Sequence, residues 1–290
     1  MRRIVRLLKA SLENRVVVLA VRAFSYSING ITLVKSLLLL IYLVRNIRSW
    51  HGIVDYCTAL LPADSPMRSL IRYHWALVDR IVWSTLGHNA WEHTVQYHDF
   101  SRVDDLRIIV SRGKGLLLLG THYGPMCGGY VLAQEGLNPV ILAAQNSIPD
   151  LASIPLRWLL TNEYIFRGTY DGMVAAHHSE RQFVRMMLAG RPGMIMMDGI
   201  AERNSRAAHC LGMNYPIGIF PFKLAVRHAF PVVIMWFSKI PGNGYRLNVE
   251  EICFGTLEEG VAQYGAFLDR IVRADPFLWS NRPRIPARRV

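Results

Sequence analysis

Short apolar runs alternate with segments of helical periodicity from about residue 104 onward. The runs are too short for buried helices and lack polar alternation, which is typical of strands buried on both faces. These predicted strands cover residues 116–119, 139–144, 194–197 and 231–237, and a glycine-rich turn leads to a further strand at 245–249. The predicted helices cover residues 128–135, 180–189 and 220–228. This alternation predicts an α/β fold with a mixed, largely parallel sheet flanked by helices.

The chain before residue 104 has a different, helical pattern. Residues 51–98 carry apolar side chains three and four positions apart, and Ser65 stands at the N-cap position before Pro66. Residues 1–15 mix arginine and lysine with aliphatic side chains, and residues 16–44 are mostly apolar. We therefore predict a membrane-anchoring helical segment at residues 1–50 and one α/β domain at residues 51–290.

The anchor has two interpretations. Charged residues and helix breakers interrupt the apolar region, so the first interpretation is a helix lying on the membrane surface. The alternative is a tilted span over residues 23–44, with Lys35 reaching the interface or packed against protein. No small-residue cleavage site follows the apolar run, so a removable secretion signal is not predicted. The basic flanks would then stay on the cytoplasmic side.

Composition adds a preference for anionic partners. Hydrophobic residues make up 51% of the chain and the net charge is +12, which suits acidic lipid, nucleic acid or an acidic carrier protein. The basic residues gather at the termini beside apolar segments and form no nucleic-acid-binding motif, so nucleic acid is the least favoured partner. The four cysteines have no zinc-ligand spacing or disulfide pattern, which indicates a reducing, cytoplasmic setting.

Two titratable residues directly follow predicted strands. His122 lies in a turn after strand 116–119, and Asp198 follows strand 194–197. Ligands of open α/β sheets bind at the carboxyl ends of the strands, so both side chains are well placed for chemistry. A purely structural histidine, bonded to nearby backbone, is the alternative for His122.

The order of these segments resembles the late acyltransferases of lipid A biosynthesis, within the wider lysophospholipid acyltransferase family. The resemblance covers roughly residues 116–284. Its segments are THYG, RPGMIMMDG, FPVVIMWF, GNGYRLNVEE, and Pro276-Phe-Leu-Trp279 followed by Arg282 and Arg284. It implies a glycerol-3-phosphate acyltransferase-like fold with N-terminal membrane-associated helices, at the cytoplasmic face of the bacterial inner membrane. The implied reaction transfers a fatty acyl chain from acyl carrier protein or coenzyme A to a lipid hydroxyl, without a metal or other cofactor.

The resemblance also implies site residues. His122 would act as general base, and groups near the turn, at Tyr123 and Gly124, would bind the substrate and the developing oxyanion. The family has an acidic residue five positions after the histidine, where this chain has Cys127. Asp198 is a possible replacement that could orient the ring. Cys127 could alternatively be an acyl-accepting nucleophile or a small core residue.

Several arginines are candidates for binding phosphate on the donor or on the acceptor head group. Arg203 and Arg206 follow Asp198 in a polar loop, and Arg167 and Arg227 are similar cases. Two functions remain open from the sequence. The chain is either an active acyltransferase using a glycolipid or lysophospholipid, or a degenerate homologue that binds lipid or serves in assembly.

Overall fold

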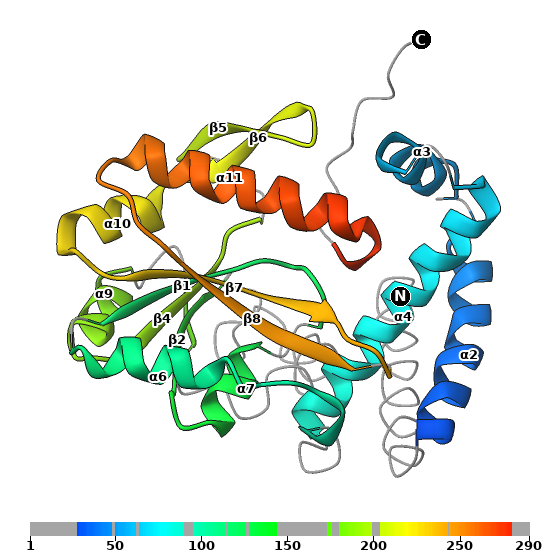
Figure 1. Cartoon of the computed structure of the whole chain (residues 1–290), viewed down its shortest axis with the longest axis horizontal. Helices are drawn as coiled ribbons and strands as arrows, with labels where there is room; N and C mark the ends of the chain where they lie inside the picture. The colour runs from blue at the N-terminus through cyan, green and yellow to red at the C-terminus, as the bar shows by residue number, and fades with distance from the viewer. Residues whose placement is uncertain are drawn as a thin grey trace, which may run out of the picture.

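A six-stranded sheet forms the centre of the computed structural model (Figure 1). The structure describes residues 28–47, 50–61, 64–89, 95–113, 115–125, 128–143, 173–175, 180–198, 204–242 and 244–279. The strand order is β3 (Met173–Ala175), β2 (Val140–Ala143), β4 (Pro192–Met196), β1 (Leu116–Gly120), β7 (Val232–Lys239) and β8 (Tyr245–Ile252). The first five strands are parallel, and β8 returns antiparallel to β7. The prediction of a largely parallel sheet is confirmed.

Helices cover both faces of this sheet. On one side lie α6 (Val103–Ser111) and α7 (Gly128–Gln134), and on the other lie α10 (Phe220–His228) and α11 (Leu257–Ala274) (Figure 1). A further helix, α9 (Glu180–Leu188), packs closely on β4, because Gly193 has no side chain where Phe183 and Met187 approach. The small hairpin of β5 (Ser205–Cys210) and β6 (Met213–Gly218) lies against α11. All four apolar runs form strands, as their pattern predicts.

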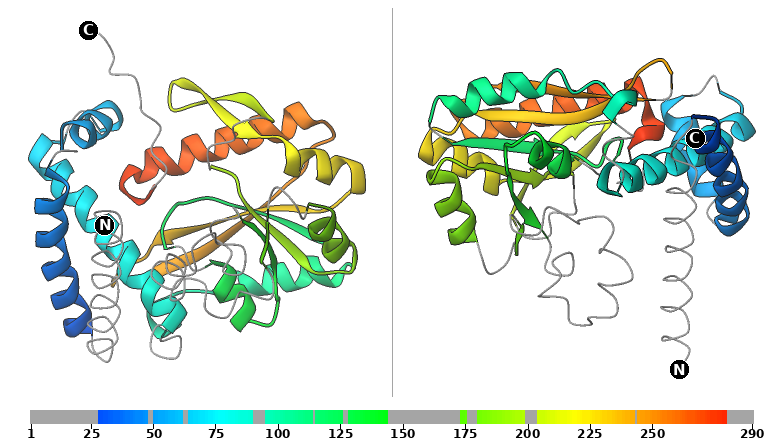
Figure 2. Two further views of the ribbon diagram at one scale, coloured as in Figure 1. Left: turned by 180° about the vertical axis from the view of Figure 1, so that it is seen from behind. Right: turned by 90° about the horizontal axis from the view of Figure 1, so that it is seen from below.

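The N-terminal helices stand beside the sheet. They are α2 (Ile28–Arg45), α3 (Trp50–Leu60), α4 (Pro66–Asn89) and the short η2 (Val95–Tyr97), and α2 packs along α4 (Figures 1 and 2). The Ser65 hydroxyl accepts a hydrogen bond from the Arg68 amide at 3.3 Å, so the predicted N-cap is confirmed. None of the described helices has both the length and the apolar character needed to cross a membrane. Residues 1–27 of the predicted anchor lie outside the described residues.

A buried charge cluster joins these helices to the end of β7. Asp79 of α4 lies 2.5 Å from the amino group of Lys35 in α2 and 2.9 Å from that of Lys239 in β7. The Tyr245 hydroxyl donates a hydrogen bond to the same carboxylate. Burial favours protonation of Asp79, but the two lysines and these hydrogen bonds outweigh it and hold its pKa below the ordinary value. Lys35 is thus packed against protein, one of the two positions foreseen for it.

His98 makes the stability of this junction depend on pH. Its Nδ1 accepts a hydrogen bond from the Tyr245 amide at 2.9 Å, and burial lowers its pKa from 6.5 to about 4. Between these values the unfolded chain binds more protons than the folded chain, so the free energy of unfolding falls as pH falls. From pH 7 to pH 4.5, urea titrations should show wild type losing about 2 to 3 kcal/mol more than His98→Gln. Equal losses would contradict this assignment.

Candidate active site

The register of two parallel strands brings His122 and Asp198 together. Gly120 at the end of β1 pairs with Met196 at the end of β4, and the Met197 amide donates to the Gly120 carbonyl at 3.0 Å. Two residues after this pair, the segment that follows β1 reaches His122 and the segment that follows β4 reaches Asp198. Both side chains consequently lie at the carboxyl edge of the sheet, where such folds bind ligands.

Gly124 allows the turn that carries His122 to lie against β7. Its φ is +79°, in the region that favours glycine, and an added Cβ would lie 2.7 Å from Cβ of Phe237. A larger residue would therefore push the turn away from the sheet. The conformation of the turn fixes the backbone of His122 relative to Asp198.

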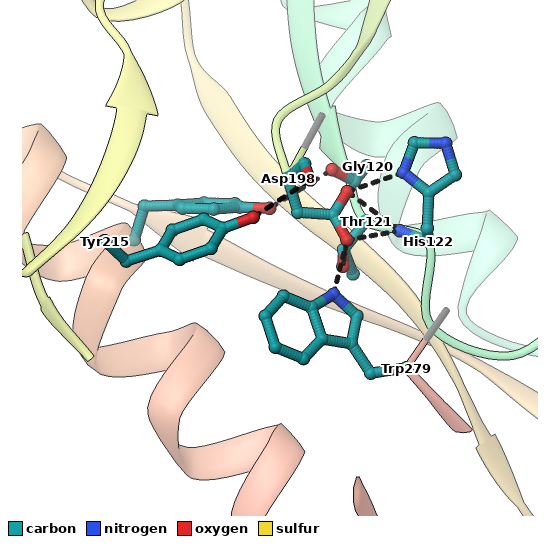
Figure 3. Close-up of polar contacts among 7 residues, drawn as sticks. Gly120, Thr121, His122, Asp198, Tyr215 and Trp279 are labelled. Atoms are coloured by element: carbon teal, nitrogen blue, oxygen red, sulfur yellow. Dashed lines mark hydrogen bonds and ion pairs between the residues drawn. The ribbon is translucent and has the colours of Figure 1, made fainter. Parts of the chain in front are cut away.

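His122 and Asp198 form a hydrogen-bonded pair. The Nδ1 atom of His122 lies 2.8 Å from Oδ1 of Asp198, and the two side chains are 23% and 0% exposed. In Figure 3 the other ring nitrogen points away from the carboxylate. A carboxylate accepts hydrogen bonds, so this contact favours the tautomer with its proton on Nδ1 and a lone pair on Nε2. The approach of Asp198 to the ring, one of the options left by the sequence, is thus observed.

Several donors hold the Asp198 carboxylate in place (Figure 3). It accepts hydrogen bonds from the His122 amide at 2.9 Å, the Thr121 hydroxyl at 2.9 Å and the Trp279 indole N–H at 2.6 Å. Complete burial raises the pKa of Asp198, but the hydrogen bonds and charge of His122, together with Trp279, outweigh burial and lower it. The carboxylate is therefore ionised and fixed in orientation.

The segment after α11 brings Trp279 to this carboxylate. Asp275 begins the short helix η6 (Pro276–Leu278), and the Leu278 carbonyl accepts a hydrogen bond from the Gly124 amide at 3.0 Å. The next residue, Trp279, forms an antiparallel bridge with Tyr123. These backbone contacts hold the segment against the His122 turn, so the indole reaches a residue that is distant in sequence.

Trp279→Phe separates hydrogen bonding from packing at this position. Phenylalanine keeps an aromatic ring but removes the N–H donor to Asp198. For a reaction in which His122 is the base, we therefore expect kcat to fall about tenfold with little change in KM. Steady-state kinetics of the purified variant, with circular dichroism as a folding check, measures both values. Trp236→Phe is a matched control, because Trp236 lies in β7 and packs on Phe267 of α11. An unchanged kcat in Trp279→Phe would remove the positioning role.

Two of the predicted substrate-binding residues, Tyr123 and Gly124, have hydrogen-bond partners within the protein. The Tyr123 hydroxyl donates to the Ile271 carbonyl at 2.8 Å and is buried, and the Gly124 amide already donates to Leu278. Both groups therefore serve the packing of the turn. The sequence indicated a turn that binds substrate, but it could not show that α11 and η6 occupy these hydrogen-bonding groups.

Two of the four predicted arginines, Arg206 and Arg227, lie within the described residues. Arg227 ends α10, after which the chain enters β7 at Val232, paired with Leu117 at the start of β1. Arg227 consequently lies towards the amino edge of the sheet, away from His122, and its role in binding phosphate stays a prediction. Arg206 is exposed on the β5–β6 hairpin. Cys127, Arg167 and Arg203 lie outside the described residues.

Sequence reasoning missed Thr121, Tyr215 and the role of Trp279. The Tyr215 hydroxyl, on the β5–β6 hairpin, donates to the Asp198 carbonyl at 3.1 Å. Trp279 was visible only as part of the C-terminal Pro-Phe-Leu-Trp motif.

Among the described residues, no group of three or more histidine, cysteine, aspartate or glutamate side chains could hold a metal ion.

Comparison with known proteins adds no family assignment. No protein-family model matches the chain, and a comparison with curated proteins finds no match. A histidine oriented by an ionised carboxylate, with its second nitrogen directed elsewhere, can remove a proton from a hydroxyl and later return one.

Proposed function

We propose that the protein is an acyltransferase that moves a fatty acyl chain from an acyl carrier protein or coenzyme A thioester to a hydroxyl of a glycolipid or lysophospholipid. The observation that supports this most is the 2.8 Å contact between His122 Nδ1 and Asp198 Oδ1 at the carboxyl edge of the sheet. It supplies the carboxylate that the motif lacks at Cys127. A histidine paired with a carboxylate could serve several base-catalysed reactions. The order of the sequence segments, which resembles that of the lipid A acyltransferases, favours acyl transfer among them.

The proposed reaction needs one base that later acts as an acid. His122 Nε2 takes the proton of the acceptor hydroxyl while its oxygen attacks the thioester carbonyl. The tetrahedral intermediate then releases the thiolate, forming an ester, and the imidazolium returns its proton to the sulfur. Asp198 stabilises the imidazolium by charge and by the Nδ1 hydrogen bond, without taking the proton itself.

The outer face of α2 supports a membrane location. Its large aliphatic side chains are 50% to 74% exposed, and they are Leu33, Leu37, Leu40, Ile41 and Val44. They recur three and four residues apart, so they share one face of the helix. Lys35 leaves this face uncharged because it turns inward to Asp79. We place this face on the cytoplasmic leaflet of the bacterial inner membrane, with the protein bound peripherally.

A lipid acylation assay tests the proposal. Purified wild type is incubated with acyl carrier protein thioesters or coenzyme A thioesters and a membrane lipid extract, and the lipids are analysed by mass spectrometry. The proposal predicts a lipid whose mass increases by one acyl group. The alternative, a degenerate homologue that only binds lipid or serves in assembly, predicts no acylated product with any of these donors.

A further inference from the structure

The segment that carries Trp279 also contacts the N-terminal helices. The Tyr56 hydroxyl of α3 donates a hydrogen bond to the Pro276 carbonyl at 3.1 Å, and this contact is buried. The Arg72 guanidinium of α4 lies over the Phe277 ring, 4.4 Å from its centre. Figure 1 shows the red segment at the end of α11 beside α4. Helix η6 is therefore held between α3 and α4 on one side and the turn that follows β1 on the other.

Helix η6 depends on these neighbours for its position. It is a single turn of three residues, which has too few internal hydrogen bonds to be stable alone. Its start is fixed by Asp275, whose side-chain oxygen accepts a hydrogen bond from the Phe277 amide at 3.1 Å. The contacts with α3 and α4 then set the point at which the chain continues into Trp279.

Arg72 is itself held before it reaches η6. Its guanidinium pairs with the Asp64 carboxylate at 2.6 Å, just before α4 begins. A guanidinium that binds a carboxylate and also stacks on an aromatic ring combines charge attraction with a planar packing surface. The Phe277 ring is 4% exposed, and the guanidinium is part of its cover. Arg72 thus gives η6 a contact of defined geometry.

The position of Trp279 matters because its hydrogen bond is short and buried. Its indole nitrogen lies 2.6 Å from Oδ2 of Asp198, and both side chains are buried. A hydrogen bond to a charged group weakens steeply when either partner moves or turns. A shift of η6 would move Trp279 as well, because the two are adjacent in the chain. Asp198 would then be held less firmly towards Nδ1 of His122.

We infer that Tyr56 and Arg72 are positioning residues of the reaction, which act on Asp198 through η6 and Trp279. The inference rests on the proposed function, since it concerns the rate of that reaction. It gives α3 and α4 a part in catalysis although they lie outside the sheet. Both residues contact η6 rather than His122, so kcat should change while KM stays constant.

A double-mutant cycle tests whether the two residues act through Trp279. In the wild-type background, Tyr56→Phe/Arg72→Ala should lower kcat about threefold to tenfold, which is no more than Trp279→Phe does. In the Trp279→Phe background the same pair should lower kcat less than about 1.5-fold, because the hydrogen bond that it supports is already absent. If the double variant does not fold, the single variants Tyr56→Phe and Arg72→Ala enter the same cycle.

Arg68→Ala is the matched control for this cycle. Arg68 is also exposed on α4, but its side chain has no ion pair or ring contact within the described part of the chain. Its replacement should leave kcat unchanged in both backgrounds.

The indole N–H resonance of Trp279 reports the same coupling without turnover. In ¹H–¹⁵N spectra of protein labelled at tryptophan, the peak that is absent from Trp279→Phe belongs to this N–H. It should move upfield in Tyr56→Phe/Arg72→Ala, because the hydrogen bond to Asp198 weakens. The peak should keep its position in Arg68→Ala.

Three results would overturn the inference. They are equal losses of kcat in the two backgrounds, an unmoved Trp279 resonance in Tyr56→Phe/Arg72→Ala, and a loss of kcat that only matches the loss of folded protein. The last result would assign Tyr56 and Arg72 to stability alone. If the resonance moves as expected while wild type acylates no lipid, the coupling of α3 and α4 to Asp198 stands and the proposed function fails.

Discussion

Replacing His122 by alanine is expected to lower the rate of lipid acylation by on the order of 10³-fold, because the substitution removes the group that accepts the hydroxyl proton. The ring is 23% exposed and its Nε2 is directed away from Asp198, so its loss should affect chemistry more than folding. The measurement is kcat/KM with an acyl thioester and a lipid acceptor, alongside the free energy of unfolding in urea.

A second histidine provides the control for this substitution. His209→Ala removes an exposed imidazole from β5 and should retain the wild-type rate. If His122→Ala retained that rate as well, His122 would be a structural residue of the turn. If both variants lost activity in proportion to lost folded protein, the effect would belong to stability.

Asp198→Asn is expected to cause a comparable loss, about 10³-fold to 10⁴-fold, for a different reason. An amide N–H₂ group facing Nδ1 would donate to it, so the ring would carry its proton on Nε2 and could no longer accept one there. The same N–H₂ group would also face the His122 backbone N–H, which donates to Oδ1 at 3.0 Å, at a cost of about 1–3 kcal/mol in the free energy of unfolding, while the amide oxygen at the Oδ2 position keeps the donors of Thr121 and Trp279. The assay compares kcat and urea unfolding in wild type and variant.

The control for Asp198→Asn is a carboxylate with an exposed partner. Asp105 pairs with Arg102 at 2.8 Å on α6, and both side chains are about half exposed. Asp105→Asn should change the free energy of unfolding by less than about 1 kcal/mol and leave the rate unaltered. An Asp198→Asn variant that turns over at the wild-type rate would show that ring orientation does not limit the reaction.

The sequence predicted the local elements well because their signals are local. Helix α10 runs from Phe220 to His228 as its periodicity indicated, and the run at 116–119 forms β1. The hairpin of β5 and β6 was missed because it contains no continuous apolar run, although exposed and buried residues alternate in it, as in strands with one face towards solvent. Helix α11 was overlooked, although its capping box of Thr256 and Glu259 stands in the sequence.

The site was only partly predictable because it depends on strand order. His122 and Asp198 could each be placed at a strand end, but their contact follows from the pairing of β1 with β4, which no local pattern encodes. Trp279 reaches Asp198 across 81 residues. Lys35 was ambiguous for the same reason, because its partner Asp79 lies on another helix.

The most direct test of the central claim follows a radiolabelled acyl group in wild type and in His122→Ala. After an acid quench, the label on lipid and the label on protein are separated and counted. The account predicts labelled lipid with wild type, background label with His122→Ala, and no acyl group retained on the protein. Equal labelling of lipid by both proteins, or label trapped on the wild-type chain, would contradict direct attack assisted by His122.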